Sequence, residues 1–145
     1  MKKILVAVDF SSVSHTVIGH AATLAHNFGA ELWIVHVAPP DLDYFKGMSG
    51  AERHDVALGL QTEHHWLQEQ AQQLRAGGVT ANALLVRGEP VEAILAEASK
   101  LSVDMIVMGS HGHTALYRAL VGSVSEGVLR DTLVPLLVIP ARKSK

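Results

Sequence analysis

Val107-Met108-Gly109-Ser110-His111-Gly112, followed after nine residues by Gly122-Ser123-Val124-Ser125, is the most informative stretch of this 145-residue chain. The apolar residues from Met105 to Met108 predict a buried strand. Gly122-Ser123 lies just before or inside an amphipathic helix, whose apolar stripe is predicted at Leu116, Leu120, Val124 and Val128. A buried strand, a glycine-rich loop and a helix in this order indicate an α/β fold.

The glycines of this stretch have the spacing Gly109, two residues, Gly112, nine residues, Gly122. Without a Cβ, backbone N–H groups can come close to a ligand and φ can be positive. Successive N–H groups in such a turn bind anions, and a helix N-terminus adds partial positive charge. The hydroxyls of Ser123 and Ser125 can bond phosphate oxygens or a metal-bound water. The stretch therefore predicts a cradle for the phosphates of a nucleotide.

A purely structural role is the alternative, in which Gly109 and Gly112 only turn the chain and Gly122 only lets two helices pack. Two related motifs are excluded. Gly122 and Gly127 have the gap of a P-loop, but Val128 and Leu129 follow where Lys and Ser or Thr are needed. No Gly-x-Gly-x-x-Gly occurs, so the dinucleotide fingerprint is missing from the sequence.

Apolar runs and helical stripes alternate along the rest of the chain. Strands are predicted at residues 4–8, 31–37, 81–86, 103–108 and 133–139, with helices at 13–28, 57–74, 91–98 and 116–128. Strands and helices that alternate in this way predict one domain, residues 1–145, with an open five-stranded parallel sheet and helices on both faces. Ligands of such sheets bind at the carboxyl ends of the strands, where the strand order reverses.

Asp9 stands at the carboxyl end of the first predicted strand, and a carboxylate there is costly to bury without a partner. We expect it to contact a ribose hydroxyl, a base or a metal ion. The alternative is a helix cap, a role that Ser11 or Ser12 could share. If the first and fourth strands are neighbours, Asp9 and Gly109 meet in one crevice.

Histidines elsewhere have simpler predicted roles. His36 is predicted to be a packed core or edge histidine, and His64-His65 to lie on a solvated helix face. No metal site is predicted, because neighbours in a helix point to different faces. Residues 39–50 form a loop of a length that is often functional.

Composition excludes several classes of protein. With 48% hydrophobic and 18% charged residues the chain is globular, and its net charge of −2 does not suggest a nucleic-acid partner. Cysteine is absent, which excludes disulfides and thiolate metal sites. The first apolar run ends at Asp9, too early for a signal peptide or a membrane span, so a soluble cytoplasmic protein is predicted.

These residues resemble the universal stress proteins of the nucleotide-binding kind over nearly the whole chain. The resemblance rests on Val6-Ala7-Val8-Asp9, Arg87-Gly88-Glu89-Pro90, the stretch from Asp104 to Gly112, Gly122-Ser123-Val124-Ser125 and Val134-Pro135. It implies a Rossmann-like sheet of the adenine nucleotide α-hydrolase type, ordered 3-2-1-4-5. It also implies a homodimer that binds ATP between strands one and four and acts in stress response or signalling.

The resemblance also implies which residues bind the nucleotide. Asp9 would face it, Val37 would flank the adenine, and Met108 and Gly109 would form the floor of the ribose site. Arg118, His111 and His113 would approach phosphate or remain in solvent. The complete predicted nucleotide site is Ala7, Val8, Asp9, Val37, Met108, Gly109, His111, Gly112, Gly122, Ser123, Val124 and Ser125.

The last predicted strand would be an edge of this sheet. It carries no charge, and a long apolar edge is an aggregation site unless it is covered or paired. Pro135 fits an edge, where its missing donor does not disrupt a ladder. We expect a homodimer that pairs this strand with its own copy, through Val134, Leu136, Leu137, Val138 and Ile139.

Two classes of function remain open at this stage. The first is a regulator that binds ATP, with Mg²⁺ accompanying it, and has no catalytic residue, because no base that would activate water is evident near the γ-phosphate. The second is a slow ATPase or phosphotransfer enzyme in which Asp9 or His111 acts. An adenylating pyrophosphatase is discounted, because Asp9-Phe10-Ser11-Ser12 replaces its Ser-Gly-Gly-x-Asp-Ser signature.

Overall fold

The computed structural model describes residues 1–38, 47–110 and 122–140. Within them, five strands form one parallel sheet in the order β3-β2-β1-β4-β5, which confirms the predicted order. The elements follow one another as β1 Lys3–Ala7, α1 Ser14–Phe28, β2 Glu31–Ala38, α2 Gly50–Ala76, β3 Ala81–Arg87, α3 Pro90–Leu101, β4 Met105–Gly109, α4 Ser123–Asp131 and β5 Leu136–Ile139.

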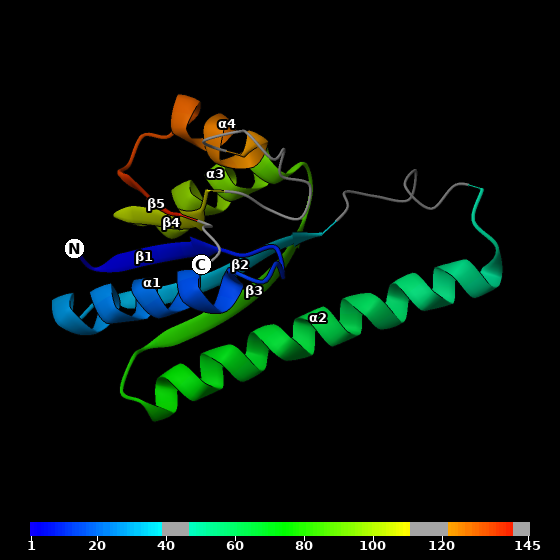
Figure 1. The fold of residues 1–145 in the computed structure, drawn as a ribbon, viewed down its shortest axis with the longest axis horizontal. Helices are drawn as coiled ribbons and strands as arrows, with labels where there is room; N and C mark the ends of the chain where they lie inside the picture. Colours follow the sequence, from blue (N-terminus) through cyan, green and yellow to red (C-terminus); the bar gives the residue numbers. More distant parts are fainter. Residues whose placement is uncertain (39–46, 111–121, 141–145) are drawn as a thin grey trace, which may run out of the picture.

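Helices cover both faces of the sheet, as predicted. Figure 1 shows α1 and α2 on one face and α3 and α4 on the other. Alternate residues of a strand point to opposite faces, so β1 feeds both cores. Ile4 and Val6 pack towards α1 and α2, whereas Leu5 packs towards α3 and α4. All three side chains are fully buried, which explains the continuous apolar run.

Several predicted boundaries are wrong, and α2 begins at Gly50 rather than at residue 57. The last strand was expected from residue 133, but β5 begins at Leu136 and Leu133 is fully exposed. The last helix begins at Ser123, and the expected stripe positions Leu116 and Leu120 lie outside the described residues. Of the expected stripe, Val128 is fully buried and Val124 is half-buried.

The contact between α3 and α4 depends on Gly127. A Cβ at this position would lie 2.7 Å from Cγ2 of Val91, closer than real side chains approach. The sequence offered helix packing as an alternative role for Gly122, whereas the structure gives that role to Gly127. The close approach buries Val128 against the sheet.

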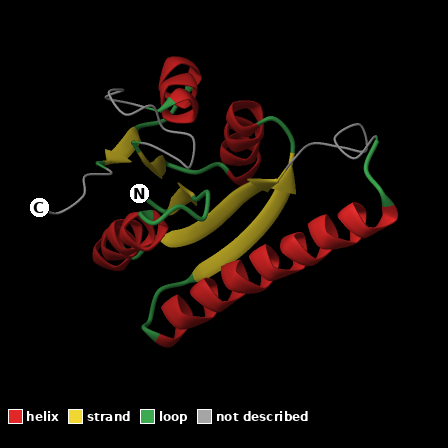
Figure 2. Cartoon of the chain, turned by 45° about the vertical axis from the view of Figure 1, so that its right-hand side comes forward, coloured by secondary structure: helices red, strands yellow, loops and turns green. Residues whose placement is uncertain are grey.

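Only part of the long helix α2 rests on the sheet. Figure 2 shows its N-terminal half extending beyond the strands. Ser49 and Glu52 form a capping box at its start, and the buried residues, Leu67, Gln70 and Ala71, belong to its second half. The first half is therefore held by the cap and by local helical bonds rather than by the core.

Side chains of α2 cover part of the outer edge of β3. Leu32 of β2 donates its N–H to the Thr80 carbonyl, so alternate peptide groups of β3 face outwards. Two of the outward carbonyls accept side-chain bonds: Ala81 O from Arg75 Nε at 2.7 Å, and Ala83 O from Gln68 Nε2 at 3.3 Å. This edge is thus partly closed to another strand.

Asp104 joins the beginnings of β1 and β4. Its Oδ2 accepts the backbone N–H groups of Lys2 and Lys3, at 2.7 and 3.0 Å, and these bonds hold the pKa of its carboxyl below the ordinary value of 3.8. A depressed carboxyl pKa stabilises the fold above the pKa of the unfolded state, and this stabilisation is lost as pH falls through the folded-state pKa.

We therefore expect Asp104→Asn to lower the melting temperature at pH 7, because a neutral amide accepts these bonds more weakly than a carboxylate. The difference from the wild type should shrink below the ordinary pKa of 3.8 and vanish in stronger acid. Melting curves of both proteins across this range measure it. A difference that is equal at all pH values would contradict the assigned role of the charge.

Candidate functional site

The carboxyl ends of β1, β2 and β4 provide one wall of the candidate site. β1 and β4 are neighbours, with Val6 paired to Val107, so the first and fourth strands meet as predicted. Ala7, Val37 and Met108 all pack on the face that α3 and α4 cover. The family resemblance implied that these three residues contact a nucleotide, and the structure brings them to the same face of the sheet.

The N-terminus of α4 adjoins the end of β4. The Gly122 N–H donates to the Ser110 carbonyl, and the Ser125 hydroxyl donates to the Gly109 carbonyl at 2.7 Å. Gly122 is the N-cap of α4 and has no side chain that could accept a bond from the first turn. Its carbonyl accepts the N–H of Glu126. The earlier N–H groups of a helix have no acceptor within it, so this end of α4 favours an anion.

One prediction about this site is wrong, and two other predicted residues make bonds within the fold. Gly122 has φ −70° and ψ 162°, so the positive φ expected of it is wrong. Ser125 is buried, and its hydroxyl donates to the Gly109 carbonyl and so joins α4 to β4. Val8 packs on the opposite face, and its N–H already donates to Val35.

Asp9 is half-buried beside this wall. Its Oδ1 accepts the N–H of Ser11 at 3.0 Å, and Phe10 between them has φ +62°. The N-cap of α1 is Val13, so the predicted alternative, that Asp9, Ser11 or Ser12 caps this helix, is wrong. The carboxylate instead holds a tight turn through its Oδ1.

Two serines of the same turn region have incomplete hydrogen bonding. Among the described residues, the hydroxyl oxygens of Ser11 and Ser14 are buried and have no partner. A buried hydroxyl without a partner costs about 1–3 kcal/mol, so a bound ligand or an ordered water is expected to supply one.

The remaining predicted residues divide into two groups. Ser123 is exposed and Val124 is half-buried at the start of α4, where the prediction placed them. His111 and Gly112, together with His113 and Arg118, lie outside the described residues. Their predicted contacts with phosphate therefore stay predictions.

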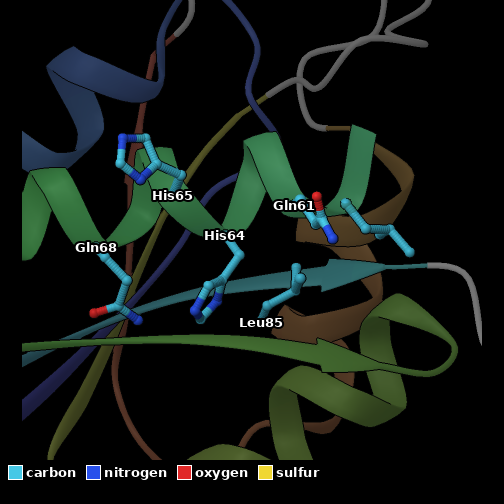
Figure 3. A pocket seen from close by; sticks show the side chains of 6 residues that line it. Gln61, His64, His65, Gln68 and Leu85 are labelled. Carbon is cyan, nitrogen blue, oxygen red and sulfur yellow. The ribbon is translucent and has the colours of Figure 1, made fainter. Parts of the chain in front are cut away.

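A second hollow lies between α2 and β3, on the face of the sheet opposite the apolar wall. It has a volume of about 580 Å³, and Figure 3 shows His64 directed towards β3 and His65 directed away from it. His65 pairs with Glu69 on the surface at 2.9 Å, and both histidines are exposed, as predicted. The lining residues are Leu60, Gln61, His64, His65, Gln68 and Leu85.

Comparison with known sequences is consistent along the whole chain. The sequence model of the universal stress protein family matches residues 1–140. Universal stress protein MJ0531 of Methanocaldococcus jannaschii is 32% identical over 146 residues, which cover 99% of this chain and 85% of that protein. Universal stress protein YxiE of Bacillus subtilis is 31% identical, over 94% of this chain and 97% of that protein.

Solved structures have the same architecture. MJ0577 of Methanocaldococcus jannaschii, also a universal stress protein, superposes with a TM-score of 0.83 and is 29% identical, with 99% of this chain and 98% of that chain covered. Two more distant structures were solved with ligands. The Archaeoglobus fulgidus protein with dAMP has a TM-score of 0.67 at 24% identity, and a universal stress protein with cAMP has 0.72 at 23%; each covers at least 96% of this chain and 98% of its own.

Proposed function

This chain belongs to the universal stress protein family, and from that premise we propose that it is a homodimeric regulator that binds ATP with Mg²⁺. The nucleotide would lie between the carboxyl end of β1 and the beginning of α4. The proposal includes a role in the response to stress. Among the described residues, no helix is long and apolar enough to cross a membrane.

One observation carries the proposal: the N-terminus of α4, which has no side-chain cap, is hydrogen-bonded to the end of β4 beside the apolar wall. The Gly122–Ser110 and Ser125–Gly109 bonds fix where α4 begins relative to β4. Ala7, Val37 and Met108 supply apolar surface on the same face of the sheet. A ligand with a flat apolar ring at one end and an anion at the other fits this arrangement.

The ligands of two structural relatives support an adenine nucleotide. Those proteins were solved with dAMP and with cAMP, both of which join an adenine to a phosphate. The two proteins are less than 25% identical to this chain in sequence, so adenine nucleotide binding by this chain is part of the proposal. The apolar wall would receive the adenine, and the N-terminus of α4 would receive phosphate.

Calorimetric titration with MgATP tests the proposal directly. Saturable binding with one site per chain is expected, and heat indistinguishable from dilution at high protein concentration would overturn it. A turnover assay on the same samples separates the regulator from the slow ATPase, since a regulator releases no phosphate above background. Chromatography of the denatured purified protein would identify any nucleotide that it carries.

Asp9→Asn separates a role towards the nucleotide from a role in the turn. The amide oxygen of Asn can still accept the Ser11 N–H, so the free energy of unfolding should change by less than about 1 kcal/mol. If Asp9 faces the nucleotide, the affinity for MgATP or its dependence on magnesium should change. An unchanged affinity together with a large loss of stability would show that Asp9 serves only the turn.

A further inference from the structure

The carboxyl end of β1 is bonded to a histidine that the proposed nucleotide site does not use. Nδ1 of His36 lies 2.8 Å from the Val8 carbonyl oxygen, and only 14% of the His36 side chain is exposed. A peptide unit is planar, so fixing this carbonyl also fixes the direction in which the chain enters Asp9. Two predicted contacts of the nucleotide lie close to His36 in the chain or through this bond: Val37 follows His36 directly, and Asp9 follows Val8.

The imidazole of His36 also supports the turn after Asp9. The Phe10 ring packs edge-on against it, with centroids 4.4 Å apart and an interplanar angle of 67°. Phe10 has φ +62°, a left-handed conformation that costs about 1–2 kcal/mol for a residue with a Cβ. Tertiary contacts must therefore hold it, and Trp66 of α2 supplies another at 5.1 Å.

Helix α2 reaches the same imidazole through a charged group. Oε2 of Glu63 lies 3.5 Å from Nε2 of His36. In the described part of the chain, three other titratable groups lie near this cluster: Asp9, bonded to the Ser11 N–H, His15 of α1, whose ring contacts Trp66 at 5.4 Å, and His64 of α2, which is directed towards β3 (Figure 3). His36 thus lies between α2 and the turn that presents Asp9.

Hydrogen-bond chemistry makes the contact with Glu63 depend on a proton. A carbonyl oxygen can only accept, so the Val8 contact requires a proton on Nδ1 of His36. A neutral imidazole has one N–H, which leaves Nε2 as an acceptor that faces an acceptor-only carboxylate. The imidazolium has a second N–H and can donate to Val8 and Glu63 together.

We propose that His36 is a proton-dependent positioning residue of the nucleotide site. Its imidazolium form joins Glu63 of α2 to the Val8 carbonyl and so holds Asp9 and Phe10 in place for the nucleotide; its neutral form keeps only the bond to Val8. The site therefore binds nucleotide more tightly when His36 carries both ring protons. This inference rests on the proposed function.

Glu63→Gln is the sharpest test, because the glutamine amide can donate to the bare Nε2 of neutral His36. The dissociation constant for MgATP is measured across the pH range for both proteins, and the ratio of the variant to the wild type removes the titration of the nucleotide itself. We expect this ratio to rise about threefold from the alkaline to the acidic end, the size of effect typical of a partly exposed ion pair.

Glu69→Gln is the matched control, since Glu69 pairs with the exposed His65 on the same helix. Its ratio to the wild type should stay constant with pH. His36→Asn keeps a donor for Val8 but cannot titrate there, so its affinity should vary less with pH than that of the wild type. In the ligand-free protein, NMR of the imidazole nitrogens should find neutral His36 protonated on Nδ1.

The outcomes separate the two proposals. MgATP binding with the same flat ratio for Glu63→Gln and Glu69→Gln would overturn the role of His36 alone, as would a neutral His36 protonated on Nε2. A failure of the wild type to bind MgATP at every pH would overturn the proposed function, and with it the role of His36 towards the nucleotide.

Discussion

Gly122→Val is expected to lower the affinity for MgATP by about tenfold to a hundredfold, because its branched side chain would occupy the approach of phosphate to α4. Hydrogen bonds to charged groups contribute about 1.5–3 kcal/mol each, and tenfold in affinity corresponds to about 1.4 kcal/mol. Backbone strain adds nothing to this expectation, since φ of −70° and ψ of 162° suit any residue. The variant should therefore fold.

Calorimetry with MgATP measures the effect, and circular dichroism establishes that the variant is folded. Gly59→Val is the matched control, because a Cβ at Gly59 meets nothing within 4 Å and the residue lies in the part of α2 that projects from the sheet. It should bind like the wild type. A folded Gly122→Val protein with unchanged affinity would exclude phosphate from the start of α4.

The second large effect is expected at β5, the sheet edge through which we propose that two chains pair. β5 lies beside β4 at the end of the strand order, and Leu136, Leu137 and Val138 are half-buried. Just before it, Leu133 is fully exposed and Leu129 of α4 is 57% exposed. An apolar strand edge with exposed leucines beside it is typical of a surface that a partner covers.

Lysine at Val138 or at Leu137 should break this dimer. Antiparallel pairing about a two-fold axis brings a residue of β5 near its own copy, and like charges in an interface cost several kcal/mol, so the dissociation constant should rise at least about a hundredfold. Both positions are needed because Leu137 packs on the α1 face, whereas its neighbour points to the other. Light scattering behind size exclusion gives the mass.

Leu58→Lys is the control for the edge, since Leu58 is an exposed leucine of α2, away from β5. It should leave the mass unchanged. A wild-type monomer at tens of micromolar would rule out the interface, and so would a dimer that persists with lysine at both positions.

The architecture could be predicted because a sheet with helices on both faces requires strands that are apolar at every position. Ile4 and Val6 face one core and Leu5 the other, which makes the first strand apolar without a break. Gly29, which directly follows the predicted helix 13–28, ends α1 in the left-handed conformation. Parallel strands share one carboxyl edge, so the end of β1 and the start of α4 could be placed near each other.

The details that escaped prediction depend on contacts between distant segments. Phe10 is left-handed while its ring rests on His36 and Trp66, and nothing in the local sequence encodes these neighbours. The glycine spacing predicted a phosphate-binding role for Gly122, but spacing alone does not determine the backbone angle φ of that residue. Gly127, which spacing did not favour, is the glycine that another helix approaches closely.

The two edges of the sheet have different consequences for self-assembly. Arg75 and Gln68 occupy carbonyls on the outer side of β3, whereas β5 presents an apolar edge. A fibre grows by adding strands at both sides of every subunit, and β3 would have to give up these side-chain bonds to take part. The proposed association through β5 would thus stop at a finite particle, because the bonds of α2 to β3 disfavour a further strand at that edge.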